Sequence, residues 1–352
     1  MEKKTKFRFF KKIYNIALKK IFSFINGKFS ISKIDKNFLL GTKVFKKKNF
    51  KIFQIKNGKI YLDSSEEKYF YIKENLILKN LSLDTEKLGK NSNILKFGIT
   101  KFIKKKNFKV ISIVSGRDAK NNYYHWLIDV LPKILILEDE IKKNKIKNIL
   151  VPNYEKRYQK ESLSCFFEKN ETNFINLSKN KFLQFDNVIF CTNNNNFEFY
   201  NYDFLKKFKN KILKYIKLKK IKSKYDYKKI YIDRLDANKK KDRFLANQKQ
   251  LKNKLKKEGF KFITLSDYSF FEQALIFNNA KLIVGLHGAG LANILFAKKS
   301  TKIIELTNSE WPDMYDKLSK CLNLNYKKVL CNKVYKNSNI IECSIQKIMR
   351  KI

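Results

Sequence analysis

Apolar residues recur at helical spacing close to the start of the chain, between Phe7 and Ile25. This spacing predicts one amphipathic helix, whose other face carries Arg8, Asn15 and several lysines. Two interpretations stay open. The helix docks on the protein's own core, or it lies in the surface of an anionic membrane, for which aromatic residues opposite lysines are suited. The apolar positions are Phe10, Ile13, Tyr14, Ala17, Leu18, Ile21, Phe24 and Ile25.

Short aromatic and β-branched runs follow over residues 43–100 and predict a segment that is mostly β structure. Two of these runs, at 52–55 and 59–62, are joined by Asn57 and Gly58. Because the dipeptide Asn-Gly is typical of a type I′ turn, the sequence predicts a β-hairpin at this point.

Strands and helices alternate from about residue 110 onward. Because such alternation forms parallel sheets through right-handed crossovers, the sequence predicts an α/β fold with two Rossmann-like halves after the β-rich segment. Ligands bind such sheets at the carboxyl ends of the strands. The first half is expected to contain strands at 110–116, 148–152, 173–177 and 187–191, and helices at 122–141 and 158–169. The second is expected to contain strands at 229–233, 260–265, 281–285, 302–306 and 326–330. Its four helices are expected at 247–258, at the capping box formed by Ser269 and Glu272, from about Gly290 onward, and at 311–322.

The length of 352 residues exceeds the usual size of one hydrophobic core, so two domains are expected. A helix predicted over 203–217 runs into the charged stretch KLKKIKSKYDYKK, which is the candidate linker. The expected organisation is the amphipathic helix at 1–30, the β-rich segment with a Rossmann-like domain at 31–218, and a second Rossmann-like domain at 219–352.

The chain has 78 basic and 32 acidic side chains, a net charge of +46, which alone would indicate binding to nucleic acid or to an anionic membrane. Lysine dominates this excess along the whole chain, and Lys, Asn, Ile and Phe share A/T-rich codons. We ascribe most of the excess to genomic composition and expect no specific nucleic-acid partner, because a nucleic-acid surface clusters its cations and uses arginine. The six arginines are Arg8, Arg117, Arg157, Arg234, Arg243 and Arg350.

The cysteine pattern favours a reducing compartment, because the cysteines are odd in number and include no C-x-x-C pair. They are Cys165, Cys191, Cys321, Cys331 and Cys343. No window of about 18 residues is free of charge, and no apolar run followed by small residues begins the chain, so neither a spanning helix nor a secretion signal is expected. The expected location is cytoplasmic, with peripheral binding to the inner face of the plasma membrane through the amphipathic helix.

The segment Gly285-Leu-His287-Gly288-Ala289-Gly290 follows a predicted strand and opens a predicted helix. Glycines let the backbone approach an anion closely, and a helix N-terminus presents unpaired N–H groups at the positive end of its dipole. The functional interpretation is a phosphate site, in which His287 can donate to a phosphate oxygen. The structural alternative is a tight turn whose glycines serve packing.

His125 and Asp129 lie four residues apart on a predicted helix and therefore share a face. Apolar residues surround them in sequence, and buried ionisable groups are costly unless they are paired or used. The pair is thus a candidate for catalysis, with a purely structural histidine–carboxylate pair as the alternative. His125 and His287 are the only histidines of the chain.

Arg234 ends the predicted strand at 229–233, where an arginine suits planar recognition of phosphate. A surface salt bridge with Asp233 or Asp236 is the alternative interpretation. The chain contains no D-x-D pair, so a metal-dependent nucleotide site is not indicated and no bound metal is expected.

Together these segments resemble glycosyltransferase family 61, which includes bacterial capsular-polysaccharide transferases, plant xylosyltransferases and animal O-linked GlcNAc transferases. The resemblance covers about residues 110–310 and rests on NYYHWLIDVLPKI, YIDRLDA, SFFEQALIFNNAKLIVGLHGAGLANILFA and KIIEL, in that order. It implies a GT-B fold, a nucleotide-sugar donor and inversion at the anomeric carbon. The family often has an arginine a few positions after its Y-I-x-R segment, where this chain has Lys239, Lys240 and Lys241 before Arg243.

The leading hypothesis is an inverting, metal-independent glycosyltransferase that needs no cofactor besides its nucleotide-sugar donor. Its acceptor would be a glycan or lipid-linked glycan, in the synthesis of capsule or another surface polysaccharide. Asp129 is the base, or His125 is the base oriented by Asp129. The alternatives are a noncatalytic membrane-attached partner of polysaccharide assembly and a basic nucleic-acid-binding protein. The candidate donor-binding residues are Arg234, His287, Gly288, Ala289, Gly290 and Glu305.

Overall fold

The chain is mixed α/β and divides into two compact units whose segments interleave along the sequence. Unit 1 comprises Met1–Asn121, Lys133–Tyr154 and Asn170–Asn196, and unit 2 comprises Asn122–Pro132, Glu155–Lys169 and Phe197–Ile352. The computed structural model describes residues 14–352 except 15–16, 19, 23, 33–35, 46–47, 64–67, 83–93, 96–97, 117–118, 169, 192–198, 223, 237–242 and 336–337.

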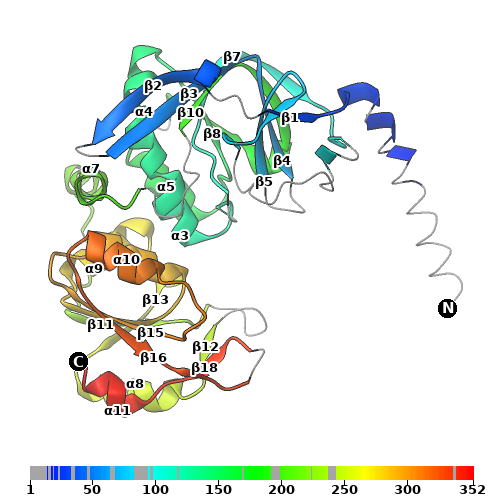
Figure 1. The fold of residues 1–352 in the computed structure, drawn as a ribbon. Helices are drawn as coiled ribbons and strands as arrows, with labels where there is room; N and C mark the ends of the chain where they lie inside the picture. Colours follow the sequence, from blue (N-terminus) through cyan, green and yellow to red (C-terminus); the bar gives the residue numbers. More distant parts are fainter. Residues whose placement is uncertain are drawn as a thin grey trace, which may run out of the picture. The chain divides into compact units, whose positions relative to one another are not determined.

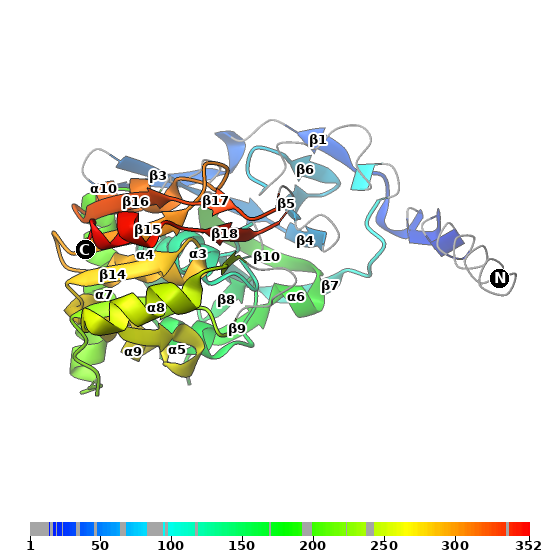
Figure 2. The ribbon, with the colours of Figure 1, turned by 90° about the horizontal axis from the view of Figure 1, so that it is seen from below.

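Unit 2 is built on a five-stranded sheet with the order β13-β11-β14-β15-β16, in which all neighbours are parallel. This is the 2-1-3-4-5 strand order of a doubly wound α/β sheet. Helices α9 and α10 cover one face of the sheet, and α8 and α11 cover the other (Figures 1 and 2). The parallel α/β architecture expected for the second half is therefore confirmed. The elements are β11 (Lys229–Asp233), α8 (Gln248–Lys257), β13 (Lys261–Thr264), α9 (Phe270–Asn279), β14 (Leu282–Leu286), β15 (Lys302–Thr307), α10 (Met314–Cys321), β16 (Asn325–Leu330) and α11 (Ile345–Met349).

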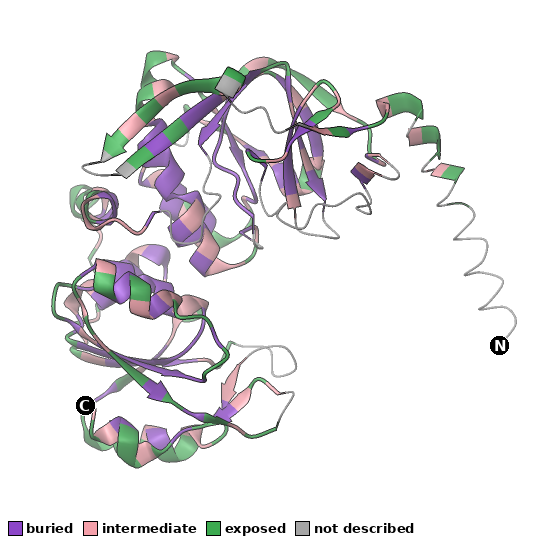
Figure 3. Cartoon of the chain, viewed as in Figure 1, coloured by how far each residue is buried: buried purple, intermediate pink, exposed green. Residues whose placement is uncertain are grey.

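Local sequence signals explain where these elements begin and what they bury. The side chain of Ser269 accepts a hydrogen bond from the Glu272 backbone N–H, and the Glu272 carboxylate accepts one from the Ser269 backbone at 2.9 Å, so the predicted capping box opens α9. Leu251 and Leu255 of α8 and Ile348 of α11 are buried in the apolar core under the sheet. Figure 3 shows the inner strands of this sheet, β11, β14 and β15, buried and the outer faces of the helices exposed.

Unit 1 contains one mixed sheet, in which β10 is the central strand. On one side β10 begins a parallel path through β7, β8 and β9, as expected for the first Rossmann-like half. On its other side β10 pairs antiparallel with β3 and β4, so the β-rich segment continues the same sheet. The strands are β1 (Ser30–Ser32), β2 (Leu39–Phe45), β3 (Lys48–Lys56), β4 (Gly58–Asp63), β5 (Lys68–Lys73), β6 (Leu76–Leu78), β7 (Lys104–Ser112), β8 (Asn148–Val151), β9 (Asn173–Asn176) and β10 (Phe182–Cys191).

The hairpin predicted at Asn57 and Gly58 is wrong. β3 and β4 do not reverse onto each other; they follow one another along β10, with Lys56 opposite Asn187 and Lys59 opposite Gln184. Asn57 takes a left-handed φ of 51° and its N–H donates to Asp186 O at 2.7 Å. The dipeptide therefore lies within a continuing edge with no change of register, because Asn57 keeps its backbone bond to β10 instead of turning the chain back.

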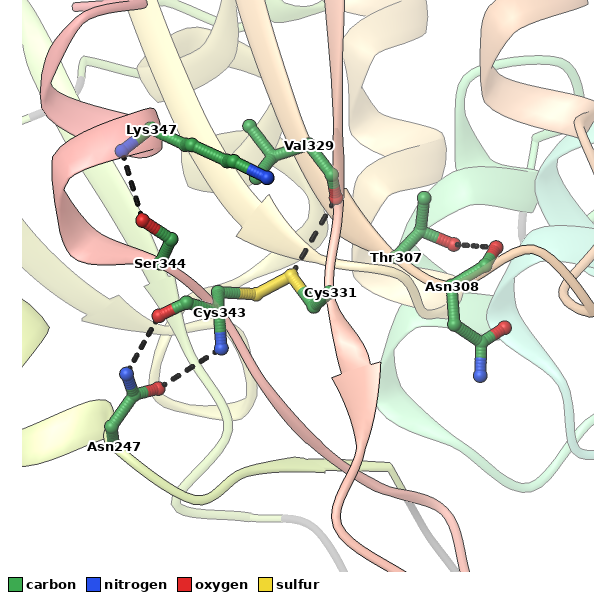
Figure 4. The surroundings of a disulfide bond; sticks show 8 residues. All are labelled: Asn247, Thr307, Asn308, Val329, Cys331, Cys343, Ser344 and Lys347. Atoms are coloured by element: carbon green, nitrogen blue, oxygen red, sulfur yellow. Dashed lines mark hydrogen bonds between the residues drawn. A yellow bond between two sulfur atoms is a disulfide. The ribbon is translucent and has the colours of Figure 1, made fainter. Parts of the chain in front are cut away.

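The small sheet of unit 2 is closed by a disulfide between Cys331 and Cys343 (Figure 4). This sheet consists of β12 (Phe244–Leu245), β17 (Asn332–Lys333) and β18 (Ile340–Glu342). Asn247 bonds the Cys343 backbone with both ends of its side-chain amide. The expectation of reduced cysteines is wrong for this pair, because the return of β18 along β17 joins two cysteines that no sequence motif connects.

We expect replacement of Cys331 and Cys343 by alanine to lower the free energy of unfolding by about 2–3 kcal/mol, as for closure of a short loop. Urea denaturation without reductant measures this, with Cys321→Ala as the control because Cys321 is a free thiol. Titration of five free thiols in the denatured wild-type chain would contradict the bond.

None of the described helices is long and apolar enough to cross a membrane.

Candidate active site

The candidate donor residues gather at the carboxyl ends of β11 and β14. These strands are neighbours in the sheet, although the chain visits β13 between them. Arg234 directly follows β11, and His287 and Gly288 directly follow β14. Because β13 lies on one side of β11 and the later strands lie on the other, this is the topological switch point, where doubly wound sheets bind ligands.

Gly288 brings the backbone against the guanidinium of Arg234. A Cβ atom at Gly288 would lie 2.7 Å from Arg234 Nη1, so only glycine leaves room for this contact. Arg234 Nη1 also donates to the His287 carbonyl at 3.3 Å, and the Tyr315 hydroxyl donates to the Gly288 carbonyl at 2.6 Å. The glycine loop is thus held between an arginine and a tyrosine, while the guanidinium has further N–H groups to offer.

A 3-10 helix, η4 (Ala289–Phe296), starts in this loop, where the sequence predicted an α-helix. The side chain of Asn293 donates to the Gly290 carbonyl at 3.2 Å within the first turn. At the other end Lys209 donates to the carbonyl of Ala297, and burial lowers the pKa of Lys209 to about 8. The first N–H groups of a helix have no intrahelical acceptor, so those of Ala289 and Gly290 are suited to an anion.

His287 lies under the loop, where its side chain is buried. Its Nδ1–H donates to Glu305 Oε1, and the Tyr326 hydroxyl donates to Glu305 Oε2 at 2.5 Å. Both carboxylate oxygens of Glu305 are therefore engaged inside the protein. Since the bond to Glu305 uses Nδ1, only the imidazolium form of His287 has a second N–H for a phosphate.

Arg243 supplies a second cation, which is stacked on Trp311. Nothing in the sequence indicates that these two residues form a pair. The Arg243 guanidinium lies over the Trp311 ring, 4.7 Å from its centroid. The backbone N–H of Trp311 donates to Asn308 Oδ1 at 2.9 Å. Arg243 and Arg234 both act electrostatically on Tyr315, although burial dominates and raises the pKa of Tyr315 well above its usual value. Two arginines thus approach the same tyrosine beside the glycine loop. Lys239, Lys240 and Lys241 lie outside the described residues.

Asp233, the partner first considered for Arg234, is engaged elsewhere. It is buried at the end of β11, and its carboxylate accepts hydrogen bonds from Gln248 at 2.6 Å and from Lys252. These two residues belong to α8, so Asp233 ties that helix to the strand end. Arg234 instead bonds the His287 carbonyl.

His125 and Asp129 are hydrogen-bonded to each other, with 2.7 Å between Nδ1 and Oδ2. Both side chains are mostly buried. The helix predicted over 122–141 is interrupted here, as α3 (Tyr123–His125), a π-helical turn η2 (Trp126–Val130) and α4 (Pro132–Lys143). Because Pro132 has no N–H to donate, the wider turn accommodates it, and Leu131 N bonds Trp126 O instead.

Tyrosines join the His125–Asp129 pair to the glycine loop within unit 2. The Tyr124 ring contacts His125 on one side and Tyr315 on the other, with centroid distances of 5.1 and 5.8 Å. The Tyr124 and Tyr200 hydroxyls bond each other at 2.6 Å. Burial raises the pKa of Tyr200 well above its usual value, and the nearby Asp129 carboxylate adds to the rise. Tyr200 and Tyr315 therefore stay neutral and can donate hydrogen bonds.

The structure thus brings His125, Asp129, Arg234, His287 and the glycine loop into one unit and places Glu305 behind His287. Sequence reasoning missed Tyr200, Trp311 and Tyr315, because isolated aromatic residues in this Phe- and Tyr-rich chain carry no local signal. Among the described residues, no three His, Cys, Asp or Glu side chains gather as a metal site would require.

Comparison with known proteins supports the resemblance seen in the sequence. The chain is 33% identical over 89 residues to the EGF domain-specific O-linked N-acetylglucosamine transferase of Gallus gallus, and 32% identical over 89 residues to that of Canis lupus familiaris. Each match covers 24% of this chain and 17% of the relative, so the chain spans about one sixth of the relatives' length. The model of the family described as Glycosyltransferase 61 matches residues 123–304, more than half of the chain, from Tyr123 into β15. The chain belongs to glycosyltransferase family 61.

Proposed function

We propose that this protein is an inverting glycosyltransferase that moves a sugar from a nucleotide-sugar donor to a glycan acceptor. One observation carries the proposal: the switch point of a doubly wound sheet presents a glycine loop and two arginines, and the rings of Tyr124 and Tyr315 connect it to a hydrogen-bonded His–Asp pair. The first group of residues suits a diphosphate, and the second suits a hydroxyl that must lose its proton.

In the proposed donor complex, the diphosphate lies at the start of η4. The N–H groups of Ala289 and Gly290 and the free nitrogens of Arg234 bind its oxygens, and Arg243 supplies the second positive charge. His287 supports the loop from below. Glu305 acts through His287, because both of its oxygens are engaged inside the protein.

In the proposed reaction, the acceptor hydroxyl oxygen forms a bond to the anomeric carbon while the bond from that carbon to the phosphate oxygen breaks. The hydroxyl proton goes to Nε2 of His125, and the nucleoside diphosphate leaves with the bonding electron pair. Of the two bases considered, the geometry favours His125, because a bond from Nδ1–H to Asp129 leaves Nε2 as an acceptor in a fixed orientation.

We expect activity to survive EDTA, because arginines and a helix N-terminus can stabilise the departing diphosphate by themselves. The measurement is the rate of nucleoside diphosphate release by chain dialysed against EDTA, compared with the same chain after addition of manganese or magnesium. Complete loss in the chelator with recovery in manganese would contradict metal independence.

We further propose a role in capsule or other surface polysaccharide synthesis, with a lipid-linked glycan as acceptor at the cytoplasmic face of a membrane. The lysine-rich amphipathic helix supports this location, whereas the cysteines do not, since two of them are bonded. A GT-B fold, with the acceptor domain at 31–218 and the donor domain at 219–352, is part of the same proposal.

A thermal-shift screen of nucleotide sugars tests the proposed function, because a ligand that binds only the native state raises its stability. The relatives' names make a nucleotide-activated N-acetylglucosamine the first donor to examine. We expect one donor and its nucleoside diphosphate to raise the melting temperature of wild type and to have a smaller effect on Arg234→Ala. No shift with any nucleotide or nucleotide sugar would contradict the proposal.

A further inference from the structure

The amphipathic helix near the N-terminus contacts the segment just before β7, within unit 1. The rings of Phe22 and Phe102 meet edge to face, with 4.9 Å between their centroids. Asn26, at the end of the helix, donates through Nδ2 to the carbonyls of Ile99 at 2.6 Å and Lys101 at 3.1 Å. The helix then ends at Gly27, whose φ of +72° is the left-handed conformation typical of such ends.

The apolar face of this helix is left uncovered by the described chain. Tyr14, Ile21 and Ile25 are 65%, 54% and 52% exposed, and Phe24 is 92% exposed. These residues share one face, since they lie at intervals of three, four and seven. The described residues of this helix therefore do not dock on the protein's own core, which is the first interpretation of the helix. Phe10 and Ile13 lie outside the described residues.

Phe102 extends the exposed apolar surface beyond the helix. It precedes β7, is 67% exposed, and contacts the helix through Phe22. The bonds from Asn26 fix the backbone just before it, at Ile99 and Lys101. The aromatic tip before β7 and the helix thus form one surface in unit 1, which we call the N-terminal apolar surface: Tyr14, Ile21, Phe24, Ile25 and Phe102.

The two chain segments that form this surface carry charges of one sign. Residues 3–34 and 87–117 contain no Asp or Glu, and Lys20, Lys28, Lys101, Lys104 and Lys105 are exposed beside it. An apolar centre with a rim of lysines fits an anionic bilayer, in which aromatic and aliphatic side chains enter the headgroup boundary while ammonium groups meet lipid phosphates. A second copy of the chain would bring the same lysines, so like charges disfavour a dimer through this face.

We propose that the N-terminal apolar surface is a two-part membrane-docking site that binds anionic phospholipid bilayers, with Phe102 as a contact of the same kind as Phe24. The inference rests on the membrane location proposed above and deepens it by naming the surface. It makes membrane binding a property of the helix together with unit 1.

Co-sedimentation of the full-length chain with vesicles tests this, using phosphatidylcholine alone and phosphatidylcholine mixed with phosphatidylglycerol. We expect wild type to pellet with the mixed vesicles and at least fivefold less with phosphatidylcholine alone. Phe24→Glu and Phe102→Glu should each lower the bound fraction at least fivefold. Tyr335→Glu is the matched control, because Tyr335 is an aromatic residue of unit 2 with 66% exposure, and it should pellet like wild type.

Nucleotide-sugar turnover in vesicle-free buffer and melting temperatures are measured on the same preparations, so that loss of docking is distinguished from loss of catalysis or of fold. No pelleting of wild type with either vesicle overturns the docking site and the membrane location, whatever the turnover. Wild-type pelleting that Phe102→Glu leaves unchanged overturns the two-part surface alone. If Phe102→Glu lowers the melting temperature, Phe102→Gln is used instead, because its side chain is neutral. Unchanged pelleting of Phe102→Gln overturns the two-part surface in the same way.

Discussion

Replacement of Arg234 by alanine is expected to weaken donor binding by about 10- to 100-fold, as for loss of charge-assisted hydrogen bonds of about 1.5–3 kcal/mol. Turnover should fall as well, because the same guanidinium faces the charge that develops on the departing diphosphate. Isothermal titration with the nucleoside diphosphate gives the affinity, and release of that product gives the rate.

Three further variants test whether the loss of donor affinity arises in the proposed donor site. Arg234→Lys keeps the charge without the planar fork and should recover only part of the affinity. Gly288→Ala places a Cβ 2.7 Å from Nη1 of Arg234 and should displace the guanidinium. Its donor affinity should lie between that of wild type and that of Arg234→Ala. Arg157→Ala removes an exposed arginine paired with Glu161 and should leave affinity and rate unchanged. Wild-type affinity in Arg234→Ala would remove Arg234 from the donor site.

Replacement of Asp129 by asparagine is expected to lower kcat by about 10²- to 10⁴-fold, the usual contribution of a positioned acid–base group. Donor affinity should not change, because the pair faces the acceptor hydroxyl. The asparagine amide can hold His125 only in the wrong tautomer, so proton transfer is lost while the shape is kept. Steady-state kinetics and titration with donor, on one preparation, give the two numbers.

His125→Gln distinguishes the two possible bases. If His125 is the base, this variant should be at least as inactive as Asp129→Asn, whereas a base at Asp129 would leave it substantially more active. Asp139→Asn is the matched control, since that carboxylate is exposed in α4 and pairs with Lys43. Equal losses of kcat and donor affinity, together with a lower melting temperature in Asp129→Asn, would return the pair to a structural role.

The parallel half of the fold was predictable because buried parallel strands are apolar runs with clear ends. The strand predicted at 281–285 is β14 at Leu282–Leu286, and the Ser269 capping box marks the start of α9 as expected. The candidate residues were also visible in the sequence, because Arg234, His287 and His125 belong to rare residue types and follow strand ends or open a helix.

The features that sequence reasoning missed depend on contacts between distant segments. Asn57 and Gly58 continue the strand instead of turning it, because β10 offers one continuous edge to both β3 and β4. Cys331 meets Cys343 only after β18 returns along β17. Arg243 stacks on Trp311 from across the small sheet, and Tyr315 reaches the Gly288 carbonyl from α10. No local pattern encodes these pairings, which are set by packing.

The most direct test of glycosyl transfer is the release of nucleoside diphosphate by the purified chain from a panel of nucleotide sugars, each with and without lipid-linked glycan acceptors. The expected result is release from one donor that the acceptor accelerates, with formation of a product whose anomeric configuration is opposite to that of the donor. Asp129→Asn should bind this donor and not turn it over. Tight donor binding by wild type with no release from any donor, in the presence of every acceptor, would contradict catalysis and favour a noncatalytic role in polysaccharide assembly.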